Sequence, residues 1–234
     1  MDAVHASRGN DVGQNGRRRV PSRVLTLPRL YPIVDAEMLE ARGLDLLGFA
    51  SELRDAGVTL LQYRDKSGSQ EEILRNAKII QEAFRGVACT LIMNDDPVLA
   101  MLSDWNAVHV GQRDAAVGEA RRVLLPEGIV GCSTHSDQQV VAANTARADY
   151  IAIGPVFATM TKANAEPVVG LEGVRRARAL TSRPLVAIGG ITPENAASVI
   201  EAGADSVAVI GALLRADVKL GDAIKMFLEN MPAA

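Results

Sequence analysis

Short apolar runs alternate with longer amphipathic segments along most of the chain. The runs carry the β-branched and aliphatic residues of buried strands, and several segments between them repeat apolar residues at helical spacing. The predicted strands are 30–35, 58–61, 90–93, 107–110, 129–132, 150–153, 185–188 and 206–210. No internal sequence repeat accompanies this alternation, which is typical of successive βα units.

Residues that start or stop helices mark several boundaries between these strands. Gly57 follows an apolar stripe and stands where a C-terminal glycine ends a helix. Ser136 or Asp137 is a suitable N-cap, and Thr192 followed by Pro193 opens another helix. The predicted helices are 46–56, 97–102, 115–124, a segment from about 137, a segment from about 171, 193–203 and 223–228.

The eight βα units predict an α/β protein, a closed (β/α)8 TIM barrel that forms a single domain at residues 27–234. The chain has 234 residues, close to the usual length of such barrels. An open doubly wound sheet is the main alternative, but its glycine-rich fingerprint is absent after the first strand. Residues 1–26 are polar and lack apolar periodicity, so we expect a flexible N-terminal arm.

The overall composition narrows the classes of partner. Hydrophobic residues make up 48% and charged residues 23%, as in globular proteins, and the net charge of -3 gives no electrostatic basis for binding nucleic acid. Because the sequence has no membrane-spanning apolar run and no secretory signal, we expect a cytoplasmic protein that does not bind membranes. Cys89 and Cys132 are expected to be reduced thiols in or near the core. Association into a homo-oligomer is left open.

Polar residues follow the predicted strands at their carboxyl ends, where the active sites of barrels lie. Gln62, Arg64 and Lys66 recur at period two, so an extended chain puts them on one face. An amide and two cations suit a phosphate or diphosphate, because Arg offers a planar donor fork and Lys a mobile charge. Taken alone, these residues fit a solvated strand end equally well.

Two carboxylates, Asp95 and Asp114, follow the neighbouring third and fourth strands. Close to Arg64 and Lys66, they would suit Mg²⁺ bound to a phosphorylated ligand, because Mg²⁺ takes few carboxylates and keeps waters and phosphate oxygens as its other ligands. The alternative is a structural ion pair of Asp95 with Arg64 or Arg113.

A second anion site is predicted after the seventh and eighth strands. Gly189 and Gly190 allow close approach of the backbone, Thr192 starts a helix with free amides, and Gly211 ends the adjacent strand. Barrels commonly bind phosphate at these two loops. The alternative is that the glycines serve only tight turns.

The long loop after the sixth strand carries Thr159, Thr161 and Lys162. Its hydroxyls and cation suit a lid over an anionic substrate, and the alternative is an ordinary mobile loop. His109 is expected to be structural. His135 lies on the rim, and no nucleophile pairs with it.

The order of the rim segments resembles that of the thiamine-phosphate synthase family over residues 31–214. The matching segments are 62–66 (QYRDK), 93–95 (MND), 108–114 (VHVGQRD), 131–135 (GCSTH), 154–162 (GPVFATMTK), 168–173 (VVGLEG) and 187–192 (AIGGIT). Each segment is short, but their number and order are highly specific. The resemblance implies a barrel that joins 4-amino-2-methyl-5-hydroxymethylpyrimidine diphosphate to a thiazole phosphate or its carboxylated form. The products would be thiamine phosphate and diphosphate.

The resemblance also implies roles for single residues. Arg64, Lys66 and Lys162 would act in catalysis by neutralising the departing diphosphate, and Mg²⁺ would be bound by Asp95 and Asp114. The pyrimidine diphosphate would contact Gln62, Arg64, Lys66, Asn94, Ser133 and Lys162. The thiazole phosphate would contact Thr159, Thr161, Gly190, Ile210 and Gly211. Tyr63 and Asp65 enter the substrate-binding set as members of the QYRDK segment, although Tyr63 by itself is typical of packing.

Three positions depart from the family pattern. Asp96 stands where arginine is usual, Gly211 where serine is common, and Ala158 where proline is usual. None of these removes a metal ligand or a diphosphate cation, so the synthase interpretation holds. The alternatives are a thiazole tautomerase, a sugar-phosphate isomerase or epimerase, and a non-catalytic phosphate-ligand sensor that uses its N-terminal arm to engage a partner.

Overall fold

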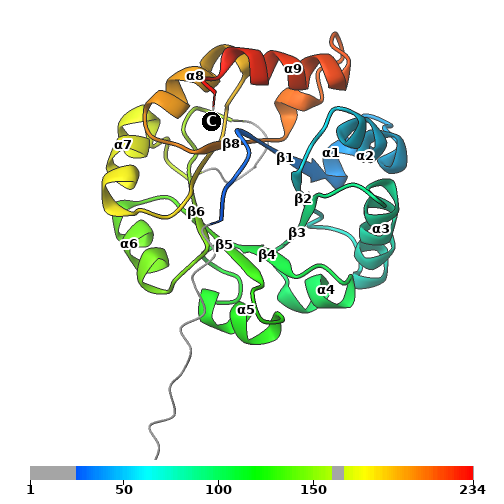
Figure 1. The fold of residues 1–234 in the computed structure, drawn as a ribbon, viewed down its shortest axis with the longest axis horizontal. Helices are drawn as coiled ribbons and strands as arrows, with labels where there is room; N and C mark the ends of the chain where they lie inside the picture. Colours follow the sequence, from blue (N-terminus) through cyan, green and yellow to red (C-terminus); the bar gives the residue numbers. More distant parts are fainter. Residues whose placement is uncertain (1–24, 160–165, 234) are drawn as a thin grey trace, which may run out of the picture.

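In the computed structural model, which describes residues 25–159 and 166–233, eight parallel strands form a closed barrel (Figure 1). The strands follow one another in chain order, and β1 pairs with β8 at Leu30 and Val207 to close the barrel. The strands are β1 (Leu30–Asp35), β2 (Leu60–Arg64), β3 (Thr90–Asn94), β4 (Ala107–Val110), β5 (Ile129–Thr134), β6 (Tyr150–Ile153), β7 (Leu185–Ile188) and β8 (Ser206–Val209). The predicted TIM barrel is therefore confirmed, with small shifts at the strand ends.

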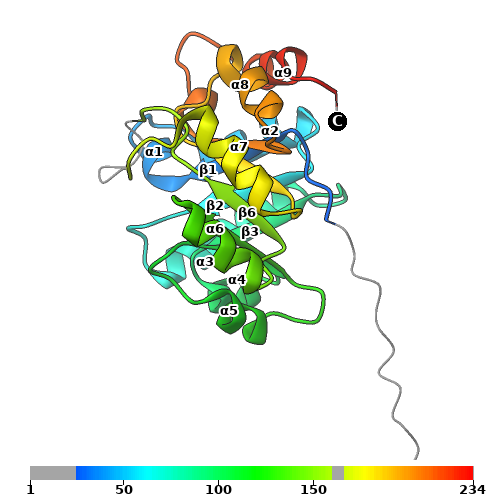
Figure 2. The same cartoon turned by 90° about the vertical axis from the view of Figure 1, so that its left-hand side faces the viewer.

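Helices surround the barrel on its outside (Figures 1 and 2). In the described part of the chain they are α1 (Ala36–Glu40), α2 (Leu46–Asp55), α3 (Gln70–Ala83), α4 (Pro97–Leu102), α5 (Val117–Val123), α6 (Asp137–Thr145), α7 (Gly170–Leu180), α8 (Pro193–Glu201), the 3-10 helix η1 (Gly211–Leu213) and α9 (Leu220–Asn230). Neither α1 nor α3 is among the predicted helices. A capping box of Ser69 and Glu72 starts α3, and Ile73, Ala77 and Ile80 repeat at helical spacing along its core-facing side.

The expected helix ends are found where the sequence places them. Ser136 caps α6 by accepting a hydrogen bond from the amide of Gln139. Gly57 follows α2 with a φ of 79°, a backbone conformation in which glycine is favoured. The expected arm lies almost entirely in residues 1–24, outside the described residues, but Leu27 is buried and packs on residues inside the barrel.

Alternation along each strand divides the buried residues into two layers. Tyr31 and Tyr150 belong to the layer inside the barrel, whereas Leu61 and Tyr63 pack with the helices. Because successive residues of a strand point to opposite faces, Gln62 points into the barrel between its two outward-facing neighbours. The same alternation places Arg64 on the inner side of the barrel, at the carboxyl end of β2. We call the end of the barrel formed by the carboxyl ends of all eight strands the mouth.

The loop after β6 is bonded to the end of β7. The amides of Val156 and Phe157 donate to the carbonyls of Ile188 and Gly189 at 2.9 and 3.0 Å. At Gly190 the φ is 64°, and a Cβ there would lie 2.5 Å from the carbonyl oxygen of Ala158. Glycine is therefore needed at position 190 both for its backbone conformation and for the close approach of this loop.

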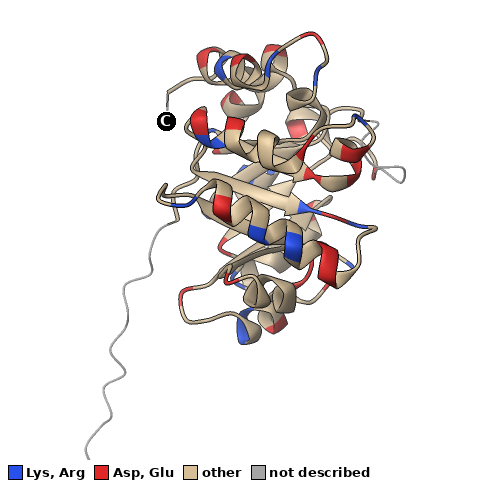
Figure 3. Cartoon of the chain, turned by 90° about the vertical axis from the view of Figure 1, so that its right-hand side faces the viewer, with Lys and Arg blue, Asp and Glu red and all other residues tan. Residues whose placement is uncertain are grey.

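Acidic and basic residues are interspersed over the helices in the view of Figure 3, and neither sign gathers into one broad patch there. This distribution fits the small net charge. Within residues 25–159 and 166–233, no helix combines the length and apolar character needed to cross a membrane.

Candidate active site at the barrel mouth

Arg64 forms a largely buried ion pair with Asp35 across the β1–β2 edge of the mouth. The side chains are 13% and 1% exposed, and the two residues lie opposite each other in the strand register. Asp35 also accepts a hydrogen bond of 3.0 Å from the amide of Met38, so it caps α1 at the same time. The carboxylate thus fixes Arg64 at the mouth while the other N–H groups of the guanidinium remain available as donors.

Lys66 pairs with Asp95 after β3, and Asp95 in turn lies beside Asp114, which follows β4. The Lys66 ammonium group bonds the carboxylate of Asp95, so the ion pair is made by a lysine and not by Arg64 or Arg113, the partners considered in the alternative to metal binding. Burial raises the pKa of Asp95, the bond from Lys66 opposes that rise, and the neighbouring Asp114 carboxyl adds to it. Asp114 itself is held by the amide of Gly111 at 2.8 Å. The two carboxylates are therefore neighbours at the mouth.

The backbone supports this arrangement at Asp95. Its φ is 66°, which is unusual for a residue other than glycine, and its amide donates to the carbonyl of His109 at 2.7 Å. Backbone of this kind is held in place by its surroundings and occurs often at functional sites. It turns the chain directly after β3, where Asp95 meets Lys66 and Asp114.

Asn94 offers a buried donor beside these charges. Its side-chain Nδ2 is buried and has no hydrogen-bond partner among the described residues. A buried N–H group without a partner costs free energy, which is recovered if a ligand oxygen accepts from it. The donor set of the mouth therefore fits an oxygen-rich anion.

The residues present also fit a hard divalent cation. In the described segments there is no cluster of three or more acidic, histidine or cysteine side chains that would enclose a metal by itself. Two interacting carboxylates, Asp95 and Asp114, suit Mg²⁺ because this ion takes its remaining ligands from water and phosphate oxygens.

A continuous hydrogen-bond chain lies beneath these charged groups, inside the barrel. Gln62 Nε2 donates to the Tyr31 hydroxyl at 2.9 Å, and this hydroxyl lies 2.8 Å from that of Tyr150. The Tyr150 hydroxyl is 2.9 Å from His109 Nδ1, and His109 Nε2 is 2.8 Å from the Ser133 hydroxyl. We call these five residues the interior chain. His109 therefore lies inside the barrel with both ring nitrogens in hydrogen bonds.

Tyr63 and Asp65 do not join the mouth. The Tyr63 hydroxyl donates to Asp65 and accepts from Asn76 on α3, both at 2.9 Å. Asp65 also accepts from the amides of Ser67 and Gly68, which shapes the loop before α3. The structure therefore gives these two side chains a role in packing and loop geometry on the helix side, in place of the direct substrate contact expected of them.

The start of α8 differs from its expected form. The amide of Thr192 donates to the side chain of Asn195 at 2.9 Å, and that side chain donates in turn to the carbonyl of Gly190 at 3.0 Å. The hydrogen bond with the Thr192 hydroxyl also lowers the pKa of Glu194 in the first turn. Because this helix end is capped by its own side chains, a phosphate here would depend on the backbone at Gly190 and Gly211 instead.

The remaining predicted residues are partly placed. Ile210 and Gly211 follow β8 directly, and Gly211 begins η1. Thr159 is described and engaged in an interaction, whereas Thr161 and Lys162 lie outside the described residues. The rim residue His135 bonds the carbonyl of Gly154 through Nδ1 at 2.6 Å.

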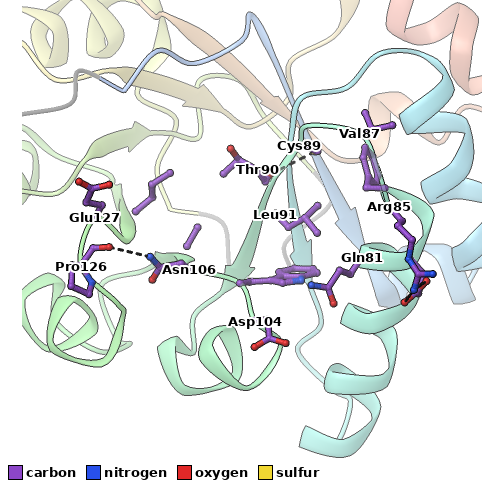
Figure 4. A pocket seen from close by; sticks show the side chains of 15 residues that line it. Gln81, Arg85, Val87, Cys89, Thr90, Leu91, Asp104, Asn106, Pro126 and Glu127 are labelled. Carbon is purple, nitrogen blue, oxygen red and sulfur yellow. Dashed lines mark hydrogen bonds and ion pairs between the residues drawn. The ribbon is translucent and has the colours of Figure 1, made fainter.

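A hollow of about 740 Å³ lies at the opposite end of the barrel (Figure 4). It is lined by Thr90 and Ala107, the first residues of β3 and β4, and by Gln81 and Arg85 near the end of α3. Barrel enzymes react at the carboxyl ends of their strands. This hollow is therefore separate from the candidate active site.

Cys89 lines this hollow and should react slowly with alkylating reagents. The thiol is free, and burial raises its pKa to about 12, so its thiolate fraction at pH 8 is about 10⁻⁴. We expect iodoacetamide to modify it at least about 100-fold more slowly in the folded protein than after unfolding in urea. Peptide mass spectrometry measures both rates, and equal rates would contradict the expectation.

Known proteins match this chain over most of its length. A family model described as thiamine monophosphate synthase matches residues 30–213. The chain belongs to this family. A thiamine-phosphate synthase from Koribacter versatilis is 54% identical over 192 residues, which cover 81% of this chain and 90% of the relative. Another, from Chloroflexus aurantiacus, is 39% identical over 189 residues, covering 81% and 86%.

A solved structure agrees with this membership of the thiamine monophosphate synthase family. The thiamine phosphate pyrophosphorylase from Pyrococcus furiosus superimposes with a TM-score of 0.75 at 27% identity, covering 86% of this chain and 95% of that one. The chain is accordingly a transferase of thiamine biosynthesis. It condenses the pyrimidine diphosphate with the thiazole phosphate to give thiamine phosphate and diphosphate.

Three residues of the site were not found from the sequence. Tyr31 and Tyr150 lie within apolar runs, and Asp35 is the last residue of the first predicted strand and has no assigned role. A usable signal was present, because a buried tyrosine hydroxyl needs a partner and strand alternation puts Tyr31 on the inner face. For Asp35, the register of β1 against β2 was the missing information.

Proposed function

We propose that the mouth binds the pyrimidine diphosphate beside Arg64, Lys66 and Asn94, with Mg²⁺ held by Asp95 and Asp114. The observation that carries this assignment is that Asp95, at the end of β3, contacts both Lys66 and the Asp114 carboxyl that follows β4. The unpartnered amide of Asn94 supports it, because it supplies a donor without breaking an existing bond.

The charges at the mouth explain why a divalent cation would be needed. Arg64 and Lys66 are both engaged by carboxylates, so the described side chains alone give a diphosphate little net attraction. When bound, Mg²⁺ would supply positive charge to the leaving diphosphate. Lys66 would exchange Asp95 for a diphosphate oxygen, while Arg64 would keep Asp35 and donate through its remaining N–H groups.

The thiazole phosphate is assigned to the far side of the mouth. Gly190 and Gly211 supply backbone at the ends of β7 and β8, where barrels commonly bind phosphate. The other contacts proposed for it are Thr159, Thr161 and Ile210. Lys162 is assigned to the diphosphate.

The reaction needs charge placement and orientation more than a protein nucleophile. As the bond from the pyrimidine methylene carbon to oxygen breaks, the diphosphate leaves with the electron pair, and the electron-rich aminopyrimidine stabilises the positive charge. The thiazole nitrogen then forms the new bond to that carbon. Arg64, Lys66 and Lys162 would neutralise the leaving group, and the phosphate contacts would hold the thiazole in line. A carboxylated thiazole would also lose carbon dioxide.

Product formation in the presence and absence of Mg²⁺ tests this proposal. We expect thiamine phosphate and diphosphate to form only when both substrates and Mg²⁺ are present, and excess EDTA to stop the reaction. Liquid chromatography measures the thiamine phosphate formed. Binding of the thiazole phosphate without any product would favour the tautomerase or the sensor instead.

We also propose that the enzyme acts in the cytoplasm. Cys89 and Cys132 are both free thiols, which suits a reducing compartment. Sedimentation velocity on the same preparation will show whether copies of the chain associate.

A further inference from the structure

The interior chain connects two residues that lie on opposite sides of the mouth. Gln62 is on β2 and Ser133 is on β5, and these strands are not neighbours in the barrel. Between them lie two hydroxyls and one imidazole, all buried, with every link between 2.8 and 2.9 Å. The two mouth residues are therefore joined by unbroken hydrogen bonding.

Each middle member of the interior chain has one proton to give. Burial raises the pKa of both Tyr31 and Tyr150, so the phenols stay protonated. A phenol that accepts one bond donates the next, and a neutral imidazole donates from one nitrogen and accepts at the other. The direction of one link therefore sets the direction of all the others.

The direction follows from the carboxamide of Gln62, whose Nε2 donates to Tyr31. Tyr31 then donates to Tyr150, and Tyr150 donates to Nδ1 of His109. Nε2–H of His109 donates to the Ser133 oxygen, which leaves the serine proton free to donate elsewhere. Gln62 keeps its Oε1 as an acceptor.

We propose that the interior chain couples the orientation of Gln62 to that of Ser133, so that the mouth presents an acceptor on the β2 side and a donor on the β5 side. Tyr31, Tyr150 and His109 are then positioning residues for the heteroaromatic substrate. This inference rests on the proposed function and places the pyrimidine ring between Gln62 and Ser133. It adds that three buried residues behind the mouth hold Gln62 as the acceptor for the exocyclic amine of the substrate.

The packing of Tyr150 supports a positioning role. Its ring stacks on His109 with centroids 5.5 Å apart and meets Tyr31 edge-on at 6.0 Å. On β5, a Cβ at Gly131 would collide with the Tyr150 ring, so the glycine makes the space in which the phenol lies. The hydroxyl is thus held between its two partners by shape as well as by hydrogen bonds.

Tyr150→Phe tests the inference because it removes one oxygen and keeps the ring. We expect the KM for the pyrimidine diphosphate to rise about 5- to 30-fold, as for loss of a buried polar contact, with the KM for the thiazole phosphate unchanged. The 4-oxo analogue of the pyrimidine diphosphate, in which a carbonyl replaces the amine, should compete with the substrate more strongly in this variant than in the wild type. The reason is that Gln62 is then free to turn its N–H groups toward the carbonyl.

Two further variants make the result specific. Tyr31→Phe removes the hydrogen-bonding hydroxyl next to Gln62 in the interior chain and should produce the same two changes. It therefore tests the inference even if Tyr150→Phe fails to fold. Ser206→Ala removes a buried hydroxyl at the start of β8, outside the interior chain, and should leave both KM values and the amine preference unchanged.

The outcomes separate this inference from the proposed function. Wild-type protein that makes no thiamine phosphate would overturn the proposed function. An active wild type, together with folded tyrosine variants that keep the wild-type KM and the preference for the amine, would overturn the inference and reduce the interior chain to core packing.

Discussion

Replacing Arg64 by methionine is expected to lower the unfolding free energy by about 3 to 5 kcal/mol, because it leaves the buried carboxylate of Asp35 without its counter-ion. The side chain of Asp35 is 1% exposed and that of Arg64 is 13% exposed, so water has little access to the Asp35 carboxylate once the guanidinium is gone. Activity should be lost as well, since the same guanidinium is assigned to the diphosphate. Urea unfolding followed by circular dichroism measures the change in stability.

A second substitution separates the two effects of Arg64→Met. Adding Asp35→Asn removes the buried charge while keeping an oxygen to cap α1, so most of the stability should return but the activity should not. Arg175→Met is a matched control, because Arg175 pairs with Glu172 on the surface and should change stability by less than about 1 kcal/mol. A single Arg64 variant as stable as the wild type would contradict the prediction.

The Asp95→Asn variant is expected to lower kcat/KM by about 100- to 1000-fold, because it weakens the proposed site for the Mg²⁺ that would neutralise the departing diphosphate. Asparagine tolerates the positive φ of this position, so the backbone should remain in place. The variant should also need a higher concentration of Mg²⁺ for half-maximal rate. Initial rates over a range of Mg²⁺ concentrations measure both effects.

Asp104 offers a matched control for this substitution. It also has a positive φ, of 57°, but it lies after α4 and lines the hollow at the opposite end of the barrel. Asp104→Asn should leave the rate and its Mg²⁺ dependence unchanged. A wild-type Mg²⁺ dependence in Asp95→Asn would remove this residue from the proposed metal site.

The fold was largely predictable because the barrel strands are apolar and regular. Periodicity found the strands, and caps such as Ser136 located the helix starts. The five residues of α1 are too few to show a periodic pattern, whereas α3 was missed although Ile73, Ala77 and Ile80 repeat at helical spacing. The start of α3 was nevertheless available as the Ser69–Glu72 capping box.

The site was predictable as a set of residues but not as a set of contacts. The positions of Lys66, Asp95 and Asp114 after neighbouring strands predicted that they lie together, because parallel strands expose their carboxyl ends at one edge. The structure brings the three residues together. The sequence did not show that Lys66 rather than an arginine pairs with Asp95, because side-chain reach depends on register. Nor did it show that the amide of Thr192 is already taken by Asn195.

The space that Gly131 leaves for Tyr150 has a consequence for how the protein can diverge. A larger residue at 131 would displace the phenol, and a smaller residue at 150 would leave a void beside the glycine. The two positions are therefore expected to covary. A lineage that exchanged both would keep a filled barrel while giving up the hydroxyl, and its substrate preference would be free to drift.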